Sequence, residues 1–245
     1  MAHLLRLADD NLVLAQRLAE WTSKAPELEE DIALTNIGLD HLGVARALYR
    51  HAGEVEGEGR SEDDLAFLRS EREYLNLLLV EQPNGDFAHT MARQLLVDAY
   101  QIGLWEALGS SADEVLAGIA AKALKEVRYH LRHSSTWVIR LGDGTDESHR
   151  RMQRSIDDLW RFTDELFTGD EVEAALVSEG IAVEPGALRP AWDERVDAVL
   201  EEATLSRPAD PYQRMGGRTG FHTEHLGHLL AELQWMQRSY PGQSW

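Results

Sequence analysis

Cysteine is absent from the 245-residue sequence. Its absence excludes disulfides, thiolate nucleophiles and iron–sulfur clusters, and it leaves only oxygen and nitrogen ligands for any metal. Long apolar runs are lacking too, because none reaches the roughly 18 residues that a membrane span needs. The first twenty residues alternate apolar and charged positions too often for a signal peptide. The sequence therefore predicts a cytoplasmic chain that does not enter a membrane.

Basic residues are scarce relative to acidic ones. The chain has 24 Lys and Arg against 43 Asp and Glu, and its formal net charge is −19. Such a negative field is repelled by nucleic acid and by anionic lipid, so binding to either is not expected. A basic or metal-bearing partner fits the charge better. An acidic surface that only keeps the chain in solution is an equally good interpretation.

Helical patterns cover most of the sequence, and only Ile181–Val183 suggests a strand. Long helices joined by short loops predict an all-α protein, a ferritin-like up-and-down helical bundle with additional C-terminal helices. We expect a single ferritin-like domain over 1–245, with its core bundle at about 4–168 and the C-terminal helices at about 170–245. The predicted helices span residues 4–21, 28–51, 62–81, 86–108, 110–141, 148–168, 170–179, 190–204 and 222–239.

Ferritin-like di-iron enzymes bind their metal with a glutamate from each of two helices and an E-x-x-H motif from each of two others. The sequence contains no E-x-x-H. The related D-x-x-H spacing occurs at Asp86/His89 and at Asp146/His149, but both aspartates stand at predicted helix starts, where an acid is more simply a cap. The motif search therefore gives no di-iron site.

Acidic residues nevertheless lie within apolar helical segments, at Asp40, Asp98 and Glu126. Gly43 stands three residues after Asp40, where a metal-binding motif would have histidine, and Tyr129 stands three residues after Glu126. This pattern is typical of a di-iron constellation that has lost its histidines. Surface charges or satisfied core groups explain each acid taken alone. The candidate vestigial metal-site positions are Asp40, Gly43, Asp98, Glu126, Tyr129 and His130.

Histidines cluster in GGRTGFHTEHLGHLLAEL, residues 216–233, at His222, His225 and His228. Side chains three and four residues apart share a helix face, so the cluster could bind a metal. The glycines indicate a loop before a helix start, and His222 near the cap would leave the regular face. A structural helix whose histidines contact a partner is therefore favoured, while a zinc-type or catalytic site stays open.

Arg218 lies in the same glycine-rich loop. Arginine beside glycines at a helix N-terminus can bind an anion. A phosphate, a carboxylate of a partner and plain solvent are the alternatives. Since the chain is strongly acidic, we do not expect it to bind an anion tightly by itself.

Six stretches of the sequence are distinctive, namely NLVLAQRLAEW, APELEEDIALTNIGLDHLG, NLLLVEQPNGDFAHTMARQ, KEVRYHLRHSSTWVIRLGDGTDES, LWRFTDELF and GGRTGFHTEHLGHLLAELQWMQRSYPGQSW. Together they resemble one known family, the structural subunits of the multicomponent phenylacetyl-CoA epoxidases, over essentially the whole chain. The resemblance implies a ferritin-like, non-catalytic subunit. It also implies that a related subunit of the same complex carries the di-iron centre and the CoA thioester, and that with a reductase it epoxidises the aromatic ring in aerobic phenylacetate breakdown. For Arg218 the resemblance makes the phosphates of CoA one candidate anion, and because the chain is acidic we expect at most an indirect contribution to binding of the CoA thioester.

Two functional hypotheses follow. The first is a structural, non-catalytic subunit without a cofactor of its own, which pairs with a catalytic di-iron epoxidase subunit and the other components. The second is an independent metal-dependent oxidase or hydrolase that uses Glu126/His130 or the His222/His225/His228 cluster. The first predicts an apolar contact surface, for which the segments 76–88 and 226–245 are the richest candidates.

Overall fold

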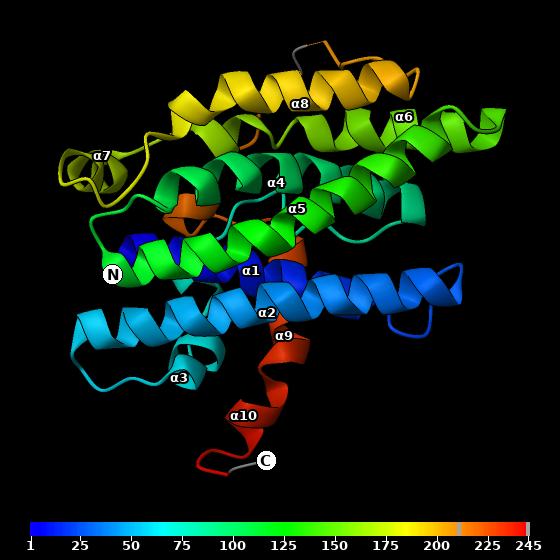
Figure 1. Cartoon of the computed structure of the whole chain (residues 1–245). Coiled ribbons are helices and arrows are strands. Elements are labelled where there is room, and N and C mark those ends of the chain that lie inside the picture. The colour runs from blue at the N-terminus through cyan, green and yellow to red at the C-terminus, as the bar shows by residue number, and fades with distance from the viewer. Residues whose placement is uncertain (210–211, 244–245) are drawn as a thin grey trace. The chain divides into compact units, whose positions relative to one another are not determined.

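Helices make up the fold (Figure 1). The computed structural model describes residues 1–209 and 212–243, and over those ranges it contains no strand, which confirms the all-α prediction. None of the described helices is both long and apolar enough to cross a membrane. The α-helices are α1 (Ala2–Ala19), α2 (Leu28–Glu56), α3 (Glu62–Phe67), α4 (Phe87–Leu108), α5 (Glu114–Gly142), α6 (Asp146–Trp160), α7 (Glu171–Ser178), α8 (Arg189–Glu202), α9 (Glu224–Leu233) and α10 (Trp235–Ser239). The 3-10 helices are η1 (Glu71–Glu73), η2 (Asp164–Phe167), η3 (Pro185–Leu188) and η4 (Gly217–Thr219).

The chain forms two compact units. Unit 1 combines residues 1–83 with the C-terminal residues from Met215 onward, and unit 2 comprises residues 84–214. The first unit therefore contains α1, α2, α3, α9 and α10, while the second contains α4 to α8. The predicted single domain over 1–245, with its core at 4–168, stays a prediction.

Unit 1 is built on the pair α1 and α2, which lie side by side (Figure 1). Leucine repeats at helical spacing along α1, and the short connection after Ala19 makes the two helices antiparallel. One face of α2 is buried through residues such as Leu34, Ile37 and Leu48. The helix ends at Gly57, whose φ of 74° is the left-handed conformation that glycine adopts without a steric penalty.

The segment after α3 differs from the sequence prediction of one helix over 62–81. The helix ends at Phe67, and residues 74–82 contain no regular helix. The backbone N–H groups of Leu75 and Leu77 donate to the Asp9 and Asp10 carboxylates of α1, at 2.8 and 2.7 Å. These bonds use donors that a helix would need for its own ladder, so the apolar run continues in an irregular conformation.

The same segment corrects the prediction of where partner contacts lie. Leu77, Leu78, Leu79 and Val80 are buried within the chain, so the expectation that residues 76–88 form an exposed apolar surface is wrong for this run. In the other candidate segment, residues 226–245, the large side chains Trp235 and Met236 of α10 are exposed, as a contact surface requires. Its last two residues, 244 and 245, lie outside the described part of the chain.

Unit 2 is built on α4 and α5, which are antiparallel and in contact along their length. Asp86 caps α4 by accepting a bond from the His89 N–H at 3.0 Å, which confirms the predicted cap. On one side of α4, α8 supplies the buried Trp192, whose indole N–H donates to the Leu96 carbonyl at 2.9 Å. An apolar and aromatic layer thus covers that side of α4.

Two further predictions in the C-terminal half are wrong. Ile181–Val183 is not a strand, because the Ile181 N–H bonds to the Leu176 carbonyl at 2.9 Å and the Ser111 hydroxyl bonds to the Ile181 carbonyl at 2.7 Å. These backbone groups close the end of α7 instead of pairing with a strand. The predicted helix over 222–239 begins at Glu224 and divides into α9 and α10 at Gln234.

Candidate functional site

A row of polar side chains follows one face of α4 in unit 2. Gln94, Asp98, Gln101 and Trp105 are spaced by four, three and four residues, so they share one face. All four residues are buried, and the exposed fraction of each is at most 3%.

Few protein atoms form hydrogen bonds with the side chains of the polar row. The Ser134 hydroxyl of α5 donates to Asp98 Oδ2 at 2.7 Å. Asp98 Oδ1, both amide atoms of Gln94, Gln101 Oε1 and the Trp105 indole N–H have no hydrogen-bond partner among the described residues. Buried polar groups of this kind are normally bonded to protein or to ordered water, so the row is a polar site within an otherwise apolar helix pair.

Asp98 is the ionisable group of the row. Burial raises the pKa of its carboxyl from 3.8 to about 7, although the nearby His130 and the Ser134 hydroxyl act to lower it. Its carboxylate oxygen and an imidazole nitrogen of His130 lie within 4.8 Å of each other. Of the predicted vestigial positions in unit 2, the structure therefore brings Asp98 and His130 together.

The other predicted positions do not share this environment. Glu126 is half-buried, and its carboxylate lies 3.5 Å from the Lys122 ammonium one turn earlier on α5. Tyr129 is exposed, and its ring stacks on His133 with the centroids 6.4 Å apart. In unit 1, Asp40 is half-buried and Gly43 is exposed on α2.

These residues do not fit a di-iron centre. Such a centre needs four carboxylates and two histidines from four helices. Within unit 2 the structure brings Asp98 and His130 close together, while the Glu126 carboxylate lies 3.5 Å from the Lys122 ammonium. Taken singly, neither unit gathers three carboxylate or histidine ligands in residues 1–209 and 212–243. One carboxylate and one imidazole cannot complete the shells of two irons.

The predicted histidine cluster separates in the structure. His222 precedes α9 and is turned into unit 1, while His228 is exposed on the helix. The Nδ1 of His222 lies 2.8 Å from Glu81 Oε2, and its Nε2 lies 2.8 Å from the Tyr74 carbonyl oxygen. Both ring nitrogens are therefore occupied by protein acceptors and neither is available to a metal.

Glu81 and His222 form a buried acid–base pair. Each side chain has 0% exposure. Burial lowers the pKa of His222. The hydrogen bond and the charge of Glu81 raise this pKa by more than burial lowers it, so it lies above its ordinary 6.5. Both imidazole nitrogens face acceptors, which requires the doubly protonated, charged ring. The backbone N–H and the hydroxyl of Thr223 donate to Glu81 Oε1, each at 2.7 Å, and complete the pair.

Arg218, the predicted anion contact, also lies within unit 1. Its guanidinium donates to Asp10 Oδ1 and Oδ2 at 3.1 and 2.8 Å, and to the Leu75 carbonyl at 2.9 Å. Burial raises the pKa of Asp10 to about 6 even though Arg218 lowers it. The neighbouring glycine is needed for this approach, because a Cβ at Gly217 would overlap the Asn76 carbonyl oxygen.

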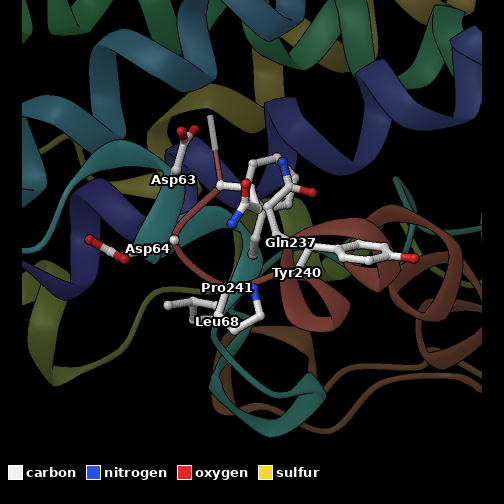
Figure 2. A pocket seen from close by; sticks show the side chains of 9 residues that line it. Asp63, Asp64, Leu68, Gln237, Tyr240 and Pro241 are labelled. Carbon is white, nitrogen blue, oxygen red and sulfur yellow. The ribbon is translucent and has the colours of Figure 1, made fainter. Parts of the chain in front are cut away.

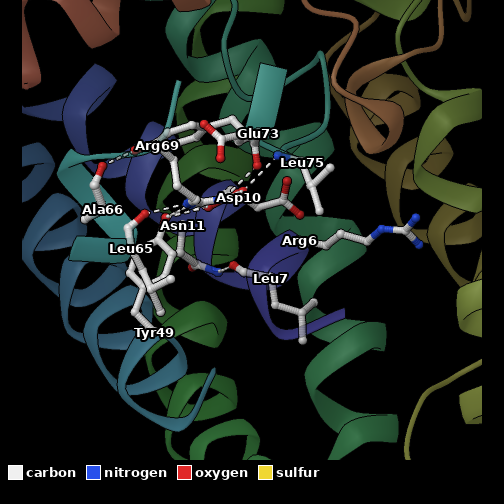
Figure 3. Close-up of polar contacts among 12 residues, drawn as sticks. Arg6, Leu7, Asp10, Asn11, Tyr49, Leu65, Ala66, Arg69, Glu73 and Leu75 are labelled. Atoms are coloured by element: carbon white, nitrogen blue, oxygen red, sulfur yellow. Dashed lines mark hydrogen bonds and ion pairs between the residues drawn. The ribbon is translucent and has the colours of Figure 1, made fainter. Parts of the chain in front are cut away.

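A third buried pair joins Asp9 to Arg69 (Figure 3). The Tyr49 hydroxyl donates to Asp9 Oδ1 at 2.5 Å, and the Arg69 guanidinium lies 4.4 Å from the centroid of the Tyr74 ring. Burial lowers the pKa of Arg69, but the Asp9 carboxylate raises it by more, so the pKa lies above its ordinary value. The guanidinium also donates to the Glu73 carbonyl at 2.8 Å, and so holds the segment after α3 against α1.

Sequence reasoning missed these three pairs, which are Asp9/Arg69, Asp10/Arg218 and Glu81/His222. The adjacent acids Asp9 and Asp10 in the leucine-rich first helix were the available signal, because adjacent residues on a helix cannot both face the same neighbour. The partners come from residues far apart in the chain, and no spacing rule relates them. Two of the pairs hold loop residues to α1, and Glu81/His222 joins two loop segments to each other.

A groove of about 510 Å³ lies in unit 1, where α3 faces the residues around α10 (Figure 2). Its labelled lining includes Asp63, Asp64 and Leu68 on one side, and Gln237 and Tyr240 on the other. The groove contains neither a histidine nor a basic side chain. It therefore lacks the paired acid, base or nucleophile that a hydrolytic site would need.

The chain is similar to proteins of phenylacetate breakdown. The family described as phenylacetic acid catabolic protein matches residues 1–245. One of the subunits of the 1,2-phenylacetyl-CoA epoxidase of Escherichia coli (strain K12) is 57% identical over 244 residues, which cover 100% of this chain and 98% of that protein. These findings confirm the resemblance that the sequence stretches indicated.

Proposed function

We propose, because this chain belongs to the phenylacetic acid catabolic protein family, that it is a non-catalytic structural subunit of a phenylacetyl-CoA ring epoxidase. In this role it pairs with the di-iron catalytic subunit and stabilises it. The reaction served is epoxidation of phenylacetyl-CoA in aerobic phenylacetate catabolism. The 57% identity to a subunit of such an epoxidase, over almost the whole length of both proteins, is the observation that carries the proposal.

The residues support a structural role. In unit 2 Asp98 lies close to His130 and Glu126 is paired with Lys122, while Gly43 of unit 1 has no side chain to supply a ligand. Catalysis by two irons would require the complete ligand set of four helices. The iron of the complex is therefore assigned to the partner subunit, and this chain contributes by holding the partner's helices in position.

The fold proposed for this role is a ferritin-like bundle. Each unit supplies one antiparallel pair of long helices, α1 with α2 and α4 with α5. A four-helix bundle consists of two such pairs, and α6 to α10 would be the additional helices. A related catalytic subunit of the same fold would present matching helices for pairing.

Reconstitution tests the proposal. The catalytic subunit, the reductase and the remaining components are assayed for epoxidation of phenylacetyl-CoA with and without this chain, and iron is measured in each purified protein. We expect little activity and poor iron retention when this chain is omitted, and no stoichiometric iron in this chain alone. Full activity without this chain, or activity from this chain with reductase alone, would refute the structural role.

An Asp98→Asn variant sharpens the reconstitution. The substitution keeps the size of the side chain and removes the carboxylate, so a non-catalytic subunit should support the wild-type rate. A loss of more than about tenfold in kcat, with the complex still intact by size exclusion, would instead favour the alternative of a metal-dependent oxidase or hydrolase. Glu126→Gln is the matched variant for the Glu126/His130 version of that alternative.

A further inference from the structure

Four large apolar side chains are exposed along the outer face of α2. Leu28 is 71% exposed, Ile32 54%, Leu39 58% and Leu42 37%. Together they follow one face of α2 on a chain whose formal net charge is −19. Exposed patches of a few hundred Å² or more on a soluble protein usually mark an interaction surface.

The spacing of these residues is that of a helix-packing seam. Leu28, Ile32, Thr35, Leu39 and Leu42 follow intervals of four, three, four and three residues. An interval averaging 3.5 residues keeps a seam facing a second helix along its length, as in coiled coils. The partner that matches this surface is therefore a helix, and the name α2 seam is used for these five residues below.

Gly43 gives an independent indication of close approach. It is exposed in the middle of α2, and a Cβ added there would meet no atom of this chain within 4 Å. Glycine in a helix interior costs roughly 0.5–1 kcal/mol relative to alanine. Nothing within the chain requires this glycine, whereas a helix packed closely against the α2 seam would.

Charge specifies the partner and its direction. The first turn of α2 carries Glu29, Glu30 and Asp31. Beyond the seam at the other end lie the exposed Arg46 and Arg50, which share the single acid Glu62 as their ion-pair partner. An antiparallel helix with acids in its own first turn would place them near these arginines. A second copy of this chain would bring another net charge of −19 to the same surface, so a less acidic partner is favoured.

We infer that the α2 seam is the docking surface for an antiparallel helix of the catalytic partner subunit. The inference rests on the proposed function, because that proposal supplies the partner. It adds the surface, the secondary structure of the bound element and its orientation. The apolar contacts of Leu39 and Ile32 provide the affinity, while the charged ends of α2 set the direction of the partner helix.

Matched charge substitutions test the seam. Dissociation constants for the catalytic subunit are measured for the wild-type chain, Leu39→Glu and Val55→Glu. Val55 lies on the same helix with 51% exposure but outside the seam. A charge buried at the centre of an interface should raise Kd at least about thirtyfold for Leu39→Glu, with less than about threefold change for Val55→Glu.

A fluorescence experiment tests the seam without depending on the folding of the Leu39→Glu variant. Because the chain has no cysteine, Ile32→Cys and Val55→Cys each give a unique site for an environment-sensitive dye. Adding the catalytic subunit should shift the emission of the Ile32→Cys conjugate to shorter wavelength and leave the Val55→Cys conjugate unchanged. Equal responses from both conjugates would overturn the assignment of the seam.

The outcomes separate this inference from the proposed function. If the wild-type chain does not bind the catalytic subunit, the proposed function fails and the inference fails with it. If wild type binds and Leu39→Glu binds equally well, only the inference is overturned. If Leu39→Glu instead dissociates a dimer of this chain in analytical ultracentrifugation and leaves binding of the catalytic subunit intact, the seam joins two copies and the assigned partner is wrong.

Discussion

The two units place their buried carboxylates in different surroundings. In unit 1 the acids Asp9, Asp10 and Glu81 each face a cation, and further donors bond to them. In unit 2 the polar row on α4 contains one carboxylate, Asp98, whose Oδ1 has no hydrogen-bond partner in the described chain. A carboxylate paired with a cation fixes the arrangement of its segments, whereas one with an unbonded oxygen leaves that atom for water.

The difference separates two groups of buried residues, the ion pairs of unit 1 and the polar row of unit 2. The pairs of unit 1 hold segments 69–82 and 216–223 in place, so removing any member leaves a buried charge uncompensated. The bond from Ser134 to Asp98 joins α4 to α5, which are also in contact along their length. We expect substitutions in the first group to destabilise the chain, and substitutions in the second to be tolerated or even stabilising.

The largest effect is expected for Arg69→Met. This change removes the cation beside Asp9 and leaves the carboxylate buried, which should lower the free energy of unfolding by about 3–5 kcal/mol. Arg50→Met is the matched control, since Arg50 pairs with Glu62 at 2.9 Å on the surface and should cost at most about 1 kcal/mol. Urea unfolding followed by circular dichroism measures both, and equal losses would show that Asp9/Arg69 is no more important than a surface pair.

Hydrogen exchange localises the same change. With Arg69 replaced, backbone amides in 69–82 should exchange faster, because Asp9 and Arg69 hold that segment against α1. Peptides from α4 and α5 should keep their protection. Uniform loss of protection across both units would contradict the assignment of this network to unit 1.

Asp98→Asn should have the next largest effect, and its sign depends on pH. Burial raises the pKa of Asp98 from 3.8 to about 7, so the folded chain binds this proton more tightly than the unfolded chain. The stability of the wild-type chain therefore falls as pH rises from about 4 to 7, by on the order of 4 kcal/mol from this group. The variant should match wild type near pH 4 and exceed it at pH 8.

The exposed Asp158 provides the control for this experiment. Asp158→Asn should change stability by less than about 0.5 kcal/mol at either pH. Asp10, whose pKa is also raised, contributes equally to all three proteins. An Asp98→Asn variant that is less stable than wild type at pH 8 would mean that the carboxylate is held as an anion.

A smaller effect, destabilising but with the same direction of pH dependence, is expected at His222. Its pKa in the folded chain lies above the ordinary 6.5, so the stabilisation it gives is complete below that pH and is lost as pH rises through the folded pKa. His222→Phe should cost about 2–3 kcal/mol at pH 6, and less at alkaline pH. At the exposed His228, substitution by Phe should leave the free energy of unfolding nearly unchanged. If the stability lost in His222→Phe does not vary with pH, the charge of His222 is not what stabilises the chain.

Much of the fold could be predicted because its helices are specified locally. Leucine spacing in α1 and the Asp86 cap of α4 are properties of neighbouring residues. The segment after α3 could not be predicted this way, since Leu75 and Leu77 give their N–H groups to acids 66 and 67 residues earlier. Helix propensity alone favoured a longer helix, and a distant side chain decided otherwise.

The candidate site was predictable to a similar extent. An acid within an apolar helix indicated the buried Asp98. Spacing could not show that Tyr129 faces solvent, because exposure depends on which helices cover α5. It could not show that His222 pairs with Glu81 either, since the two residues are 141 positions apart.

The smallest predicted effect is at Gly43, and it links stability to partner binding. Gly43→Ala should raise the stability of the isolated chain by about 0.5–1 kcal/mol, because alanine loses less backbone entropy in a helix and its Cβ meets no atom of this chain. Gly53→Ala on the same helix should be destabilising, since its Cβ would lie 2.5 Å from the Arg60 carbonyl oxygen. If a partner helix approaches the α2 seam closely, Gly43→Ala should also weaken binding of the catalytic subunit several-fold. A variant that is more stable and binds equally well would show that the partner does not come close at this glycine, because one methyl group at a tight helix crossing must displace the opposing backbone.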